Sequence, residues 1–221
     1  MSNLARKLFA EFLGVTIFVT AIVGVSTPMM GSPLGGLAAA TTLGLMILAT
    51  AQFSGGHLNP AVSLYFFARK QLSVTDFIGY VAAQLLGGLA GAYVGGLIWG
   101  FPAGPNVATA VPAGSFYSEI LATGILVGLV GHLAQSKQGQ LIPVAVTAWV
   151  FAAGTFTSSG AFANPAVTLG RVFASHGAIS ANGAGSYVLA QVIGTLLGLI
   201  LIGYIFNTDK KSKSGKKSKK K

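Results

Sequence analysis

Two asparagines begin the same four-residue motif in the two halves of the chain. Asn59 and Asn164 each start the sequence Asn-Pro-Ala-Val, and they stand 105 residues apart. An amide side chain offers two N–H donors and a carbonyl acceptor while carrying no charge. A neutral polar molecule can exchange hydrogen bonds with such groups. The pair therefore suggests recognition of uncharged solutes rather than bond-breaking chemistry.

The other groups that could do chemistry are two glutamates, Glu11 and Glu119. A buried carboxylate is a candidate general acid or base, but no histidine or nucleophile stands at a matching position beside either one. The three histidines are not spaced for joint ligation of a metal, and the chain has no cysteine. We therefore expect no enzyme, and no bound metal or other cofactor.

The composition indicates that these polar groups belong to a membrane protein. Of the 221 residues, 52% are hydrophobic and 8% are charged, whereas soluble domains have about 25% charged residues. A helix crosses the apolar core of a bilayer with about 20 residues. Six stretches are long and apolar enough to do so, namely 8–29, 34–53, 77–99, 116–134, 141–157 and 185–206.

Two further segments, 54–70 and 158–174, contain the asparagine motifs and do not fit as spans. Each begins with Ser and Gly, reaches Asn-Pro and then turns apolar for about ten residues. Pro suits the first turn of a helix, where its missing N–H costs nothing. Ten helical residues rise about 15 Å, half of an apolar core about 30 Å thick. We expect two half-helices that re-enter the membrane.

The polar landmarks of the first half recur in the second half at a nearly constant offset. The offset is 105 residues for the asparagine pair, 107 for Gln84 and Gln191, and 108 for the glutamate pair. Because each half has three spans, the halves enter the membrane in opposite orientations, as in inverted-repeat proteins. The sequence predicts one all-α membrane domain over 1–206, with six transmembrane helices and two re-entrant half-helices. Repeat 1 covers about 5–100 and repeat 2 about 115–206.

The basic residues predict the orientation of the chain. Most fall on one side of the predicted spans, at Arg6, Lys7, Arg69, Lys70, Lys137 and the Lys-rich tail 207–221. The connection 100–115 has no charge and falls on the other side. Because basic loops face the cytoplasm, we expect a multi-pass protein of a bacterial or archaeal plasma membrane with both termini cytoplasmic. We expect the tail to lie in solvent near membrane lipid rather than to bind nucleic acid.

The two half-helices would bring their N-termini together near the middle of the bilayer. Each N-terminus carries about half a positive charge from its unpaired N–H groups, and each asparagine adds an amide donor. Irregular backbone at this depth is tolerated only inside protein or along a water-filled path. We expect a narrow polar path that repels cations and protons and passes neutral solutes. Its wall would include the backbone carbonyls of Gly55, Gly56, His57 and Phe162.

These motifs resemble those of the aquaporin and aquaglyceroporin family, the major intrinsic proteins. The matching residues are AEFLG (10–14), SGGHLNPAV (54–62), SEILAT (118–123) and ANPAV (163–167), and the likeness covers about 5–206. The likeness implies a homotetramer with one pore in each subunit. It implies pore-lining roles for Asn59, Pro60, Ala61, Asn164, Pro165 and Ala166. It also implies that four buried residues brace the re-entrant loops, namely Glu11, Glu119, Gln84 and Gln191.

The likeness further implies a selectivity filter outward of the asparagine pair. Counted from the motifs, its four positions are Ala39, Ala152, Ala161 and Val167. Water-selective members resemble one another in bulky aromatic and His residues there, with an Arg where this chain has Val167. Three alanines and a valine predict a wide, apolar filter. The closer likeness is to bacterial members that lack this Arg and are associated with metalloids or methylated arsenicals.

The sequence therefore predicts a passive channel for water, glycerol-like solutes, and neutral metalloids or methylated arsenicals. One alternative is a water-selective channel in which Arg171, one helical turn beyond Val167, serves the filter instead of lying in the outer vestibule. An alternating-access transporter also uses inverted repeats and broken helices, but it usually needs an ion site, and this midplane offers amides rather than acids. A membrane junction protein with little transport is a third alternative.

Overall fold

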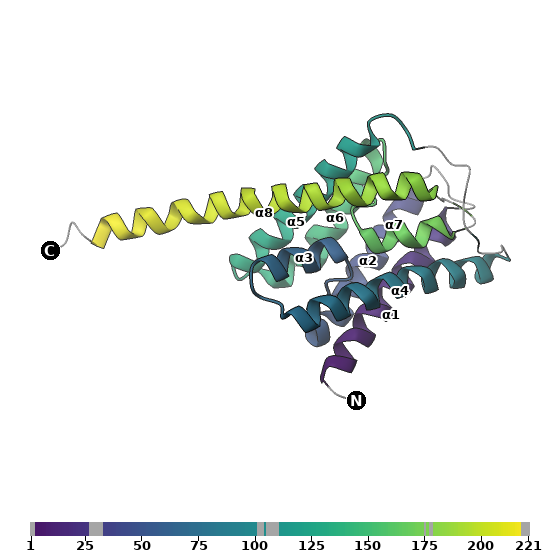
Figure 1. Cartoon of the computed structure of the whole chain (residues 1–221), viewed down its shortest axis with the longest axis horizontal. Helices are drawn as coiled ribbons and strands as arrows, with labels where there is room; N and C mark the ends of the chain where they lie inside the picture. The colour runs from purple at the N-terminus through teal and green to yellow at the C-terminus, as the bar shows by residue number, and fades with distance from the viewer. Residues whose placement is uncertain are drawn as a thin grey trace.

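The computed structural model describes residues 3–26, 33–100, 104, 111–174, 176 and 179–217. Within these ranges six helices are long: α1 (Asn3–Val25), α2 (Pro33–Ser54), α4 (Val74–Trp99), α5 (Ser115–Gln135), α6 (Ile142–Phe156) and α8 (Ala181–Lys217). Two are short, α3 (Pro60–Ala68) and α7 (Pro165–Val172), and a 3-10 turn (Gly139–Leu141) precedes α6. Figure 1 shows α3 and α7 following one another along the bundle, among the long helices. The fold class predicted from the sequence is confirmed.

Two helices, α4 and α8, extend beyond the predicted spans, because each includes polar residues that the hydropathy of the sequence left out. α4 begins at Val74 rather than at 77, because the Ser73 hydroxyl accepts a hydrogen bond from the Asp76 N–H at 3.0 Å. Hydropathy does not reveal such a polar first turn. The predicted end of the first span, at 29, lies outside the described residues. α8 continues past 206 into the Lys-rich tail as far as Lys217, and Figure 1 shows this part extending beyond the other helices.

Glycines allow the long helices to pack closely in pairs. α1 packs against α4, and α5 packs against α8. A Cβ atom at Gly91 of α4 would lie 2.5 Å from the carbonyl oxygen of Thr16 in α1. A Cβ atom at Gly198 of α8 would lie 2.6 Å from the carbonyl oxygen of Gly124 in α5. These positions therefore need glycine for helix contact, as in other membrane bundles.

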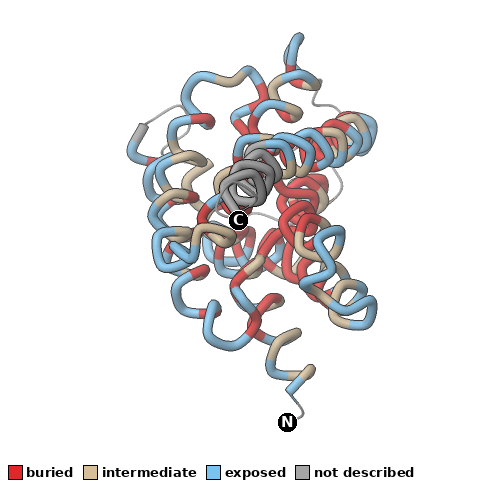
Figure 2. The backbone as a smooth tube through the Cα atoms, turned by 90° about the vertical axis from the view of Figure 1, so that its left-hand side faces the viewer, coloured by how far each residue is buried: buried red, intermediate tan, exposed pale blue. Residues whose placement is uncertain are grey.

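The outer surface of the bundle is apolar. Figure 2 views the chain along the bundle, with most buried residues toward the middle and exposed ones around the outside. Large apolar side chains are strongly exposed there, for example Val144 at 69%, Ile98 at 66% and Leu48 at 64%. Six helices of the described part are long and apolar enough to cross a membrane. Such a surface is suited to lipid, since a soluble monomer rarely exposes apolar area so widely.

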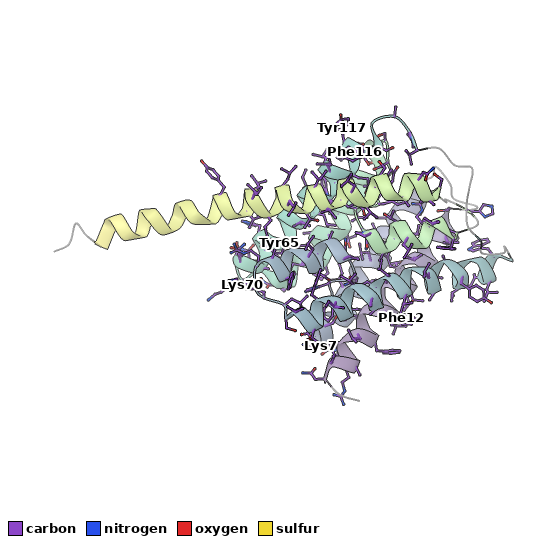
Figure 3. All side chains as sticks on the ribbon, in the orientation of Figure 1. Lys7, Phe12, Tyr65, Lys70, Phe116 and Tyr117 are labelled. Atoms are coloured by element: carbon purple, nitrogen blue, oxygen red, sulfur yellow. The ribbon has the colours of Figure 1, made fainter. Side chains whose placement is uncertain are left out.

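Polar contacts join the basic segments to neighbouring helices. Lys7 near the start of α1 donates to Asp76 at the start of α4, with 2.9 Å between Nζ and Oδ2. Arg69 at the end of α3 donates to Gln135 at the end of α5, at 3.4 Å. Figure 3 labels Lys7 and also Lys70, the residue that follows Arg69. The second contact links the first half of the chain to the second half.

Candidate functional site

Each asparagine motif starts one of the half-helices. Asn59 and Asn164 cap α3 and α7 with extended backbone, and Pro60 and Pro165 occupy the first turns. Each asparagine side-chain oxygen accepts a hydrogen bond from the backbone N–H of the alanine two residues later, at 2.8 Å and 2.9 Å. The oxygen of each amide thus serves its own helix. The amide nitrogen remains to bond elsewhere.

The two amide nitrogens bond across to the opposite motif. Asn59 Nδ2 donates to the carbonyl oxygen of Ala163 at 2.8 Å, and Asn164 Nδ2 donates to that of Leu58 at 2.9 Å. Both asparagines are buried, at 5% and 3% exposed. The N-termini of the half-helices therefore meet, joined by two equivalent hydrogen bonds. An amide nitrogen has two N–H donors, so each asparagine has a second donor besides the one that makes this bond.

Left-handed backbone precedes both asparagines. Leu58 has φ 49° and Ala163 has φ 45°, in a region that residues with a Cβ rarely adopt. The carbonyls of these two residues are the ones that accept from the opposite asparagines. Gly56, two residues before Leu58, is also left-handed, and a Cβ there would lie 2.8 Å from the Ile47 carbonyl oxygen. The Gly-rich segment thus permits a turn that a bulkier sequence would block.

Glu11 of α1 holds the segment before α3. Its Oε1 accepts from the His57 N–H at 3.0 Å and from the Ser54 hydroxyl at 2.6 Å. Its Oε2 accepts from the Leu58 N–H and from Gln84 Nε2, at 2.6 Å and 2.7 Å. Glu11 is fully buried. The carboxylate therefore supplies acceptors to backbone groups that no helix satisfies.

Glu119 of α5 makes equivalent contacts in the second half. It accepts from the N–H groups of Phe162 and Ala163, at 2.9 Å and 2.8 Å. It also accepts from Gln191 Nε2 at 2.7 Å, and Gln191 donates in turn to the Thr168 hydroxyl at 2.9 Å. Neither glutamate is among the described residues that line the two cavities beside α3 and α7. Within the described ranges no three His, Asp or Glu residues gather as a metal site.

A wide cavity, of about 490 Å³, lies beside α7 and the segment that precedes it. Three of the four predicted filter residues line it, namely Ala39, Ala161 and the buried Val167. Phe162, which the sequence placed on the pore wall, lines it as well. Most of the other lining residues are apolar or glycine. A solute entering here therefore meets space and a wall of mixed apolar and polar surface.

A narrow cavity, of about 40 Å³, lies beside α3. Gly55, Gly56 and His57, whose carbonyls were expected on the pore wall, line this cavity. Four residues line both cavities, namely Asn59, Asn164, Leu43 and Leu126. The cavities therefore adjoin at the asparagine pair. Together they form a path past both amides.

The prolines and alanines of the two motifs lie behind this path. Four residues that were expected to line the pore are buried and are not among the described residues that line either cavity, namely Pro60, Ala61, Pro165 and Ala166. They belong to the first turns of half-helices that pack against the bundle. A Cβ atom at Gly170 of α7 would lie 2.5 Å from the carbonyl oxygen of Gly88 in α4. Of each motif, the asparagine is the residue that lines both cavities.

Ala152 lies elsewhere than the sequence led us to expect. It is exposed on α6 and is not among the residues that line the wide cavity. Counting back from Asn164 gives a distance along the chain, but it does not give the rotation of α6 about its axis. Successive side chains of a helix point about 100° apart, so that rotation decides which of them face the cavity. The α6 residues that line the wide cavity are Val150, Phe151, Gly154 and Thr155. The aromatic Phe151 was not predicted from the sequence.

Arg171 also lines the wide cavity. Its guanidinium carbon lies 3.9 Å from the centre of the Phe162 ring, and that ring meets Tyr187 edge-on with 5.0 Å between centroids. A cation stacked on an aromatic face is attracted to it electrostatically. Among the described residues lining this cavity, Arg171 is the one with a charged side chain.

An acidic residue at either asparagine should damage the exclusion of cations. In Asn59→Asp or Asn164→Asp, an acidic oxygen replaces the N–H donor that faces the opposite carbonyl, so the link between the half-helices is lost. The negative charge also offsets the positive helix ends and attracts cations. We expect higher Na⁺ and proton leak into proteoliposomes. Gln135→Glu, a matched amide-to-acid change at the end of α5, should stay tight. Well-folded Asp variants without any leak would place the barrier elsewhere.

Six apolar helices around two half-helices that meet at paired asparagines define a channel-like membrane protein. The chain belongs to the family described as major intrinsic protein, whose model matches residues 1–158 and again 107–221. It is accordingly an integral, multi-pass membrane channel for water or glycerol-type solutes, and not an enzyme. The family membership inferred from the sequence motifs is confirmed.

The chain is similar to several relatives over most of its length. Aquaglyceroporin AqpS of Rhizobium meliloti (strain 1021) is 28% identical over 215 residues, covering 92% of this chain and 91% of the relative. Aquaporin NIP3-1 of Oryza sativa subsp. japonica is 32% identical over 215 residues, covering 89% and 67%. The X-ray structure of the aquaglyceroporin from Plasmodium falciparum matches with TM-score 0.67 at 22% identity, covering 89% of this chain and 94% of that chain. This last likeness concerns the fold alone.

Proposed function

We propose that this channel passes glycerol-like solutes, neutral metalloids and methylated arsenicals as well as water. The observation that carries the proposal is the wall of the wide cavity at Val167. An apolar side chain stands there, and Ala39 and Ala161 add little bulk to a cavity of about 490 Å³. A solute with methyl or methylene groups gains apolar contact in such a space. The similarity to proteins named aquaglyceroporin supports the water and glycerol part of this range.

The proposal assigns the exclusion of ions to the asparagine pair. Two helix N-termini meet there, each with about half a positive charge, and the remaining amide donors offer hydrogen bonds to a neutral solute. A cation is repelled and finds no carboxylate among the described residues that line either cavity. Passive diffusion needs no ion site, whereas a transporter coupled to an ion gradient would need one.

The proposed range is tested by comparing solutes in one preparation. Stopped-flow light scattering on proteoliposomes should measure the flux of water, glycerol, urea and neutral arsenite side by side. A passive channel of the proposed kind passes glycerol and arsenite at rates that rise linearly with concentration. Flux of water alone would reject the solute range. Saturation at low concentration would favour alternating access, and flux no faster than in empty liposomes would favour a junction protein.

A water-selective channel is the second candidate, because Arg171 lines the wide cavity. In this candidate Arg171 supplies the filter cation that position 167 lacks. The stacking of the Arg171 guanidinium on the Phe162 ring holds the cation against the wall. A cation at the wall leaves the middle of the cavity open, which favours the first candidate. Variants of both Val167 and Arg171 separate the two candidates.

We also infer how the channel sits in its membrane. Both termini face the cytoplasm of a bacterial or archaeal cell, the domain over 1–206 assembles as a homotetramer, and the tail 207–221 lies near anionic lipid. The basic residues on one side of the spans support this orientation. A cysteine introduced at Ala113, before α5, should react with an impermeant label from outside intact cells. A cysteine at Lys221 should be protected, and labelling of both from outside would refute the orientation.

A further inference from the structure

The two cavities carry equivalent groups of three side chains. Beside α7, the group is Arg171 stacked on Phe162, with Tyr187 against the edge of the Phe162 ring at an interplanar angle of 81°. The residues at the same places of the first motif are 57 and 66, each 105 residues earlier, and Tyr80 stands 107 residues before Tyr187. The first half therefore holds a matching group beside α3.

The group beside α3 contains only rings. His57 and Phe66 stack with 4.6 Å between ring centroids and 19° between planes, and Tyr80 meets His57 edge-on at 5.2 Å. Phe66 thus takes the place that Arg171 has in the second half. Both His57 and Phe66 line the narrow cavity, as Arg171 and Phe162 line the wide one.

Hydrogen bonds hold His57 in place against the Phe66 ring. Its Nδ1 lies 3.1 Å from the Ser63 hydroxyl, which also accepts from Gln84 Nε2 at 2.9 Å. Its backbone N–H donates to Glu11 at 3.0 Å. A residue held through one ring nitrogen and through its backbone is a firm support for its stacking partner, because offset aromatic stacking favours one arrangement of the two rings. Phe66 therefore has a preferred position beside the narrow cavity.

The walls that complete the narrow cavity are branched apolar side chains. Ile47 of α2 is 5% exposed and Val146 of α6 is 3% exposed, and Ile142 at the start of α6 packs against the same apolar core. All three line the narrow cavity together with Phe66. Its volume, about 40 Å³, is less than a tenth of the about 490 Å³ on the other side of the asparagines.

We propose that the size limit of this pore is set beside α3, by Phe66 on its His57 support and by Ile142 facing the same narrow cavity. The wide cavity then selects by polarity and apolar contact, and the narrow cavity selects by size. Glycerol passes, while larger polyols are slowed after the asparagine pair. This inference rests on the proposed function in one respect, namely that solutes larger than water enter the wide cavity.

The test compares permeation of water, urea, glycerol, erythritol and xylitol through proteoliposomes of four variants. Phe66→Ala should raise the flux of erythritol and xylitol several-fold over wild type, with a smaller change for water. Ile142→Ala should also raise the flux of erythritol and xylitol more than that of water. Ile142 belongs to a different helix, and its replacement leaves the His57 support intact. Phe67→Ala is the matched control, because Phe67 stacks on Phe77 at 4.5 Å and lines neither cavity. Its solute series should equal that of wild type.

The fourth variant, Phe151→Ala, enlarges the wide cavity instead. If Phe151→Ala raises xylitol flux while Phe66→Ala and Ile142→Ala do not, the limit lies beside α7 and the inference is wrong. Unchanged solute series in both folded Phe66→Ala and Ile142→Ala would overturn it as well. The proposed function fails separately, if wild type passes water but no glycerol. In that case a gain of glycerol flux in Phe66→Ala would still support the size limit.

Discussion

Glu119→Ala should remove most water and solute flux, and Glu11→Ala should do the same. Glu119 is fully buried and accepts three hydrogen bonds, two of them from backbone N–H groups just before α7. Each buried donor left without an acceptor costs about 1–3 kcal/mol. Three such losses are comparable to the whole stability of many domains, about 5–15 kcal/mol. The half-helix would lose its position, and the path past the asparagines would close or the protein would not fold.

The measurements for this prediction are the yield of folded protein in detergent, its Tm, and water flux per channel. Ser118→Ala is the matched control on the same helix, because the Ser118 hydroxyl pairs with Ser158 at an exposed site. It should leave all three quantities near wild type. Glu119→Gln keeps one acceptor oxygen and should fall between the two. A Glu119→Ala protein with wild-type Tm and flux would show that the segment before α7 does not depend on this carboxylate.

The position of the half-helices followed from local rules in the sequence. Asn followed by Pro is a strong helix start, because Asn caps the helix and Pro fits its first turn. The repeat then indicated that two such starts face each other, and Asn59 and Asn164 do meet. The acceptors of their amide nitrogens could not be predicted. Those carbonyls belong to Leu58 and Ala163, which both have left-handed backbone. Leu and Ala rarely adopt this conformation, so their presence in the sequence does not indicate it.

Which residues line the cavities depends on how each helix is rotated about its axis. This rotation is harder to predict from the sequence than the start of a helix. Val167 and Ala161 stand within a few residues of the second motif, so their positions follow from it, and both line the wide cavity. Ala152 lies on a separate helix, where an error of one residue turns the side chain by about 100°. The structure has Phe151 and its neighbours at the cavity instead. An apolar helix such as α6 shows too little contrast between its faces to reveal this rotation.

The difference in volume between the two cavities could not be predicted from the sequence either. In the sequence, Phe66 is one of several apolar residues after the first motif. Its place beside the path depends on stacking with His57, a contact that needs the three-dimensional arrangement of the turn before α3. The equivalence of positions 66 and 171 is visible in the repeat. In the structure, the Phe66 ring lines the narrow cavity and the Arg171 cation lines the wide one. This difference becomes apparent only when the residues that line both cavities are known.

Val167→Arg should lower the flux of glycerol and methylated arsenicals relative to water. Val167 lies in the first turn of α7, where its N–H is 3.4 Å from the Asn164 side-chain oxygen, so the change leaves the cap intact. The wide cavity has room for the longer side chain. The added cation takes up space, removes apolar contact and adds donors that suit water. We expect the solute-to-water ratio to fall on the order of tenfold, equal to about 1.4 kcal/mol in the barrier.

Arg171→Ala and Val167→Leu complete this experiment, in the same stopped-flow assay. Val167→Leu adds bulk without charge and should change the solute-to-water ratio far less than Val167→Arg does. If Arg171 already serves the filter, Arg171→Ala should raise the ratio, because the cation that selects water has been removed. If Arg171 stays stacked on Phe162 at the wall, its removal leaves the ratio near wild type. An unchanged ratio in Val167→Arg would show that position 167 does not control passage. A raised ratio in Arg171→Ala would assign the filter to Arg171 and favour the water-selective candidate.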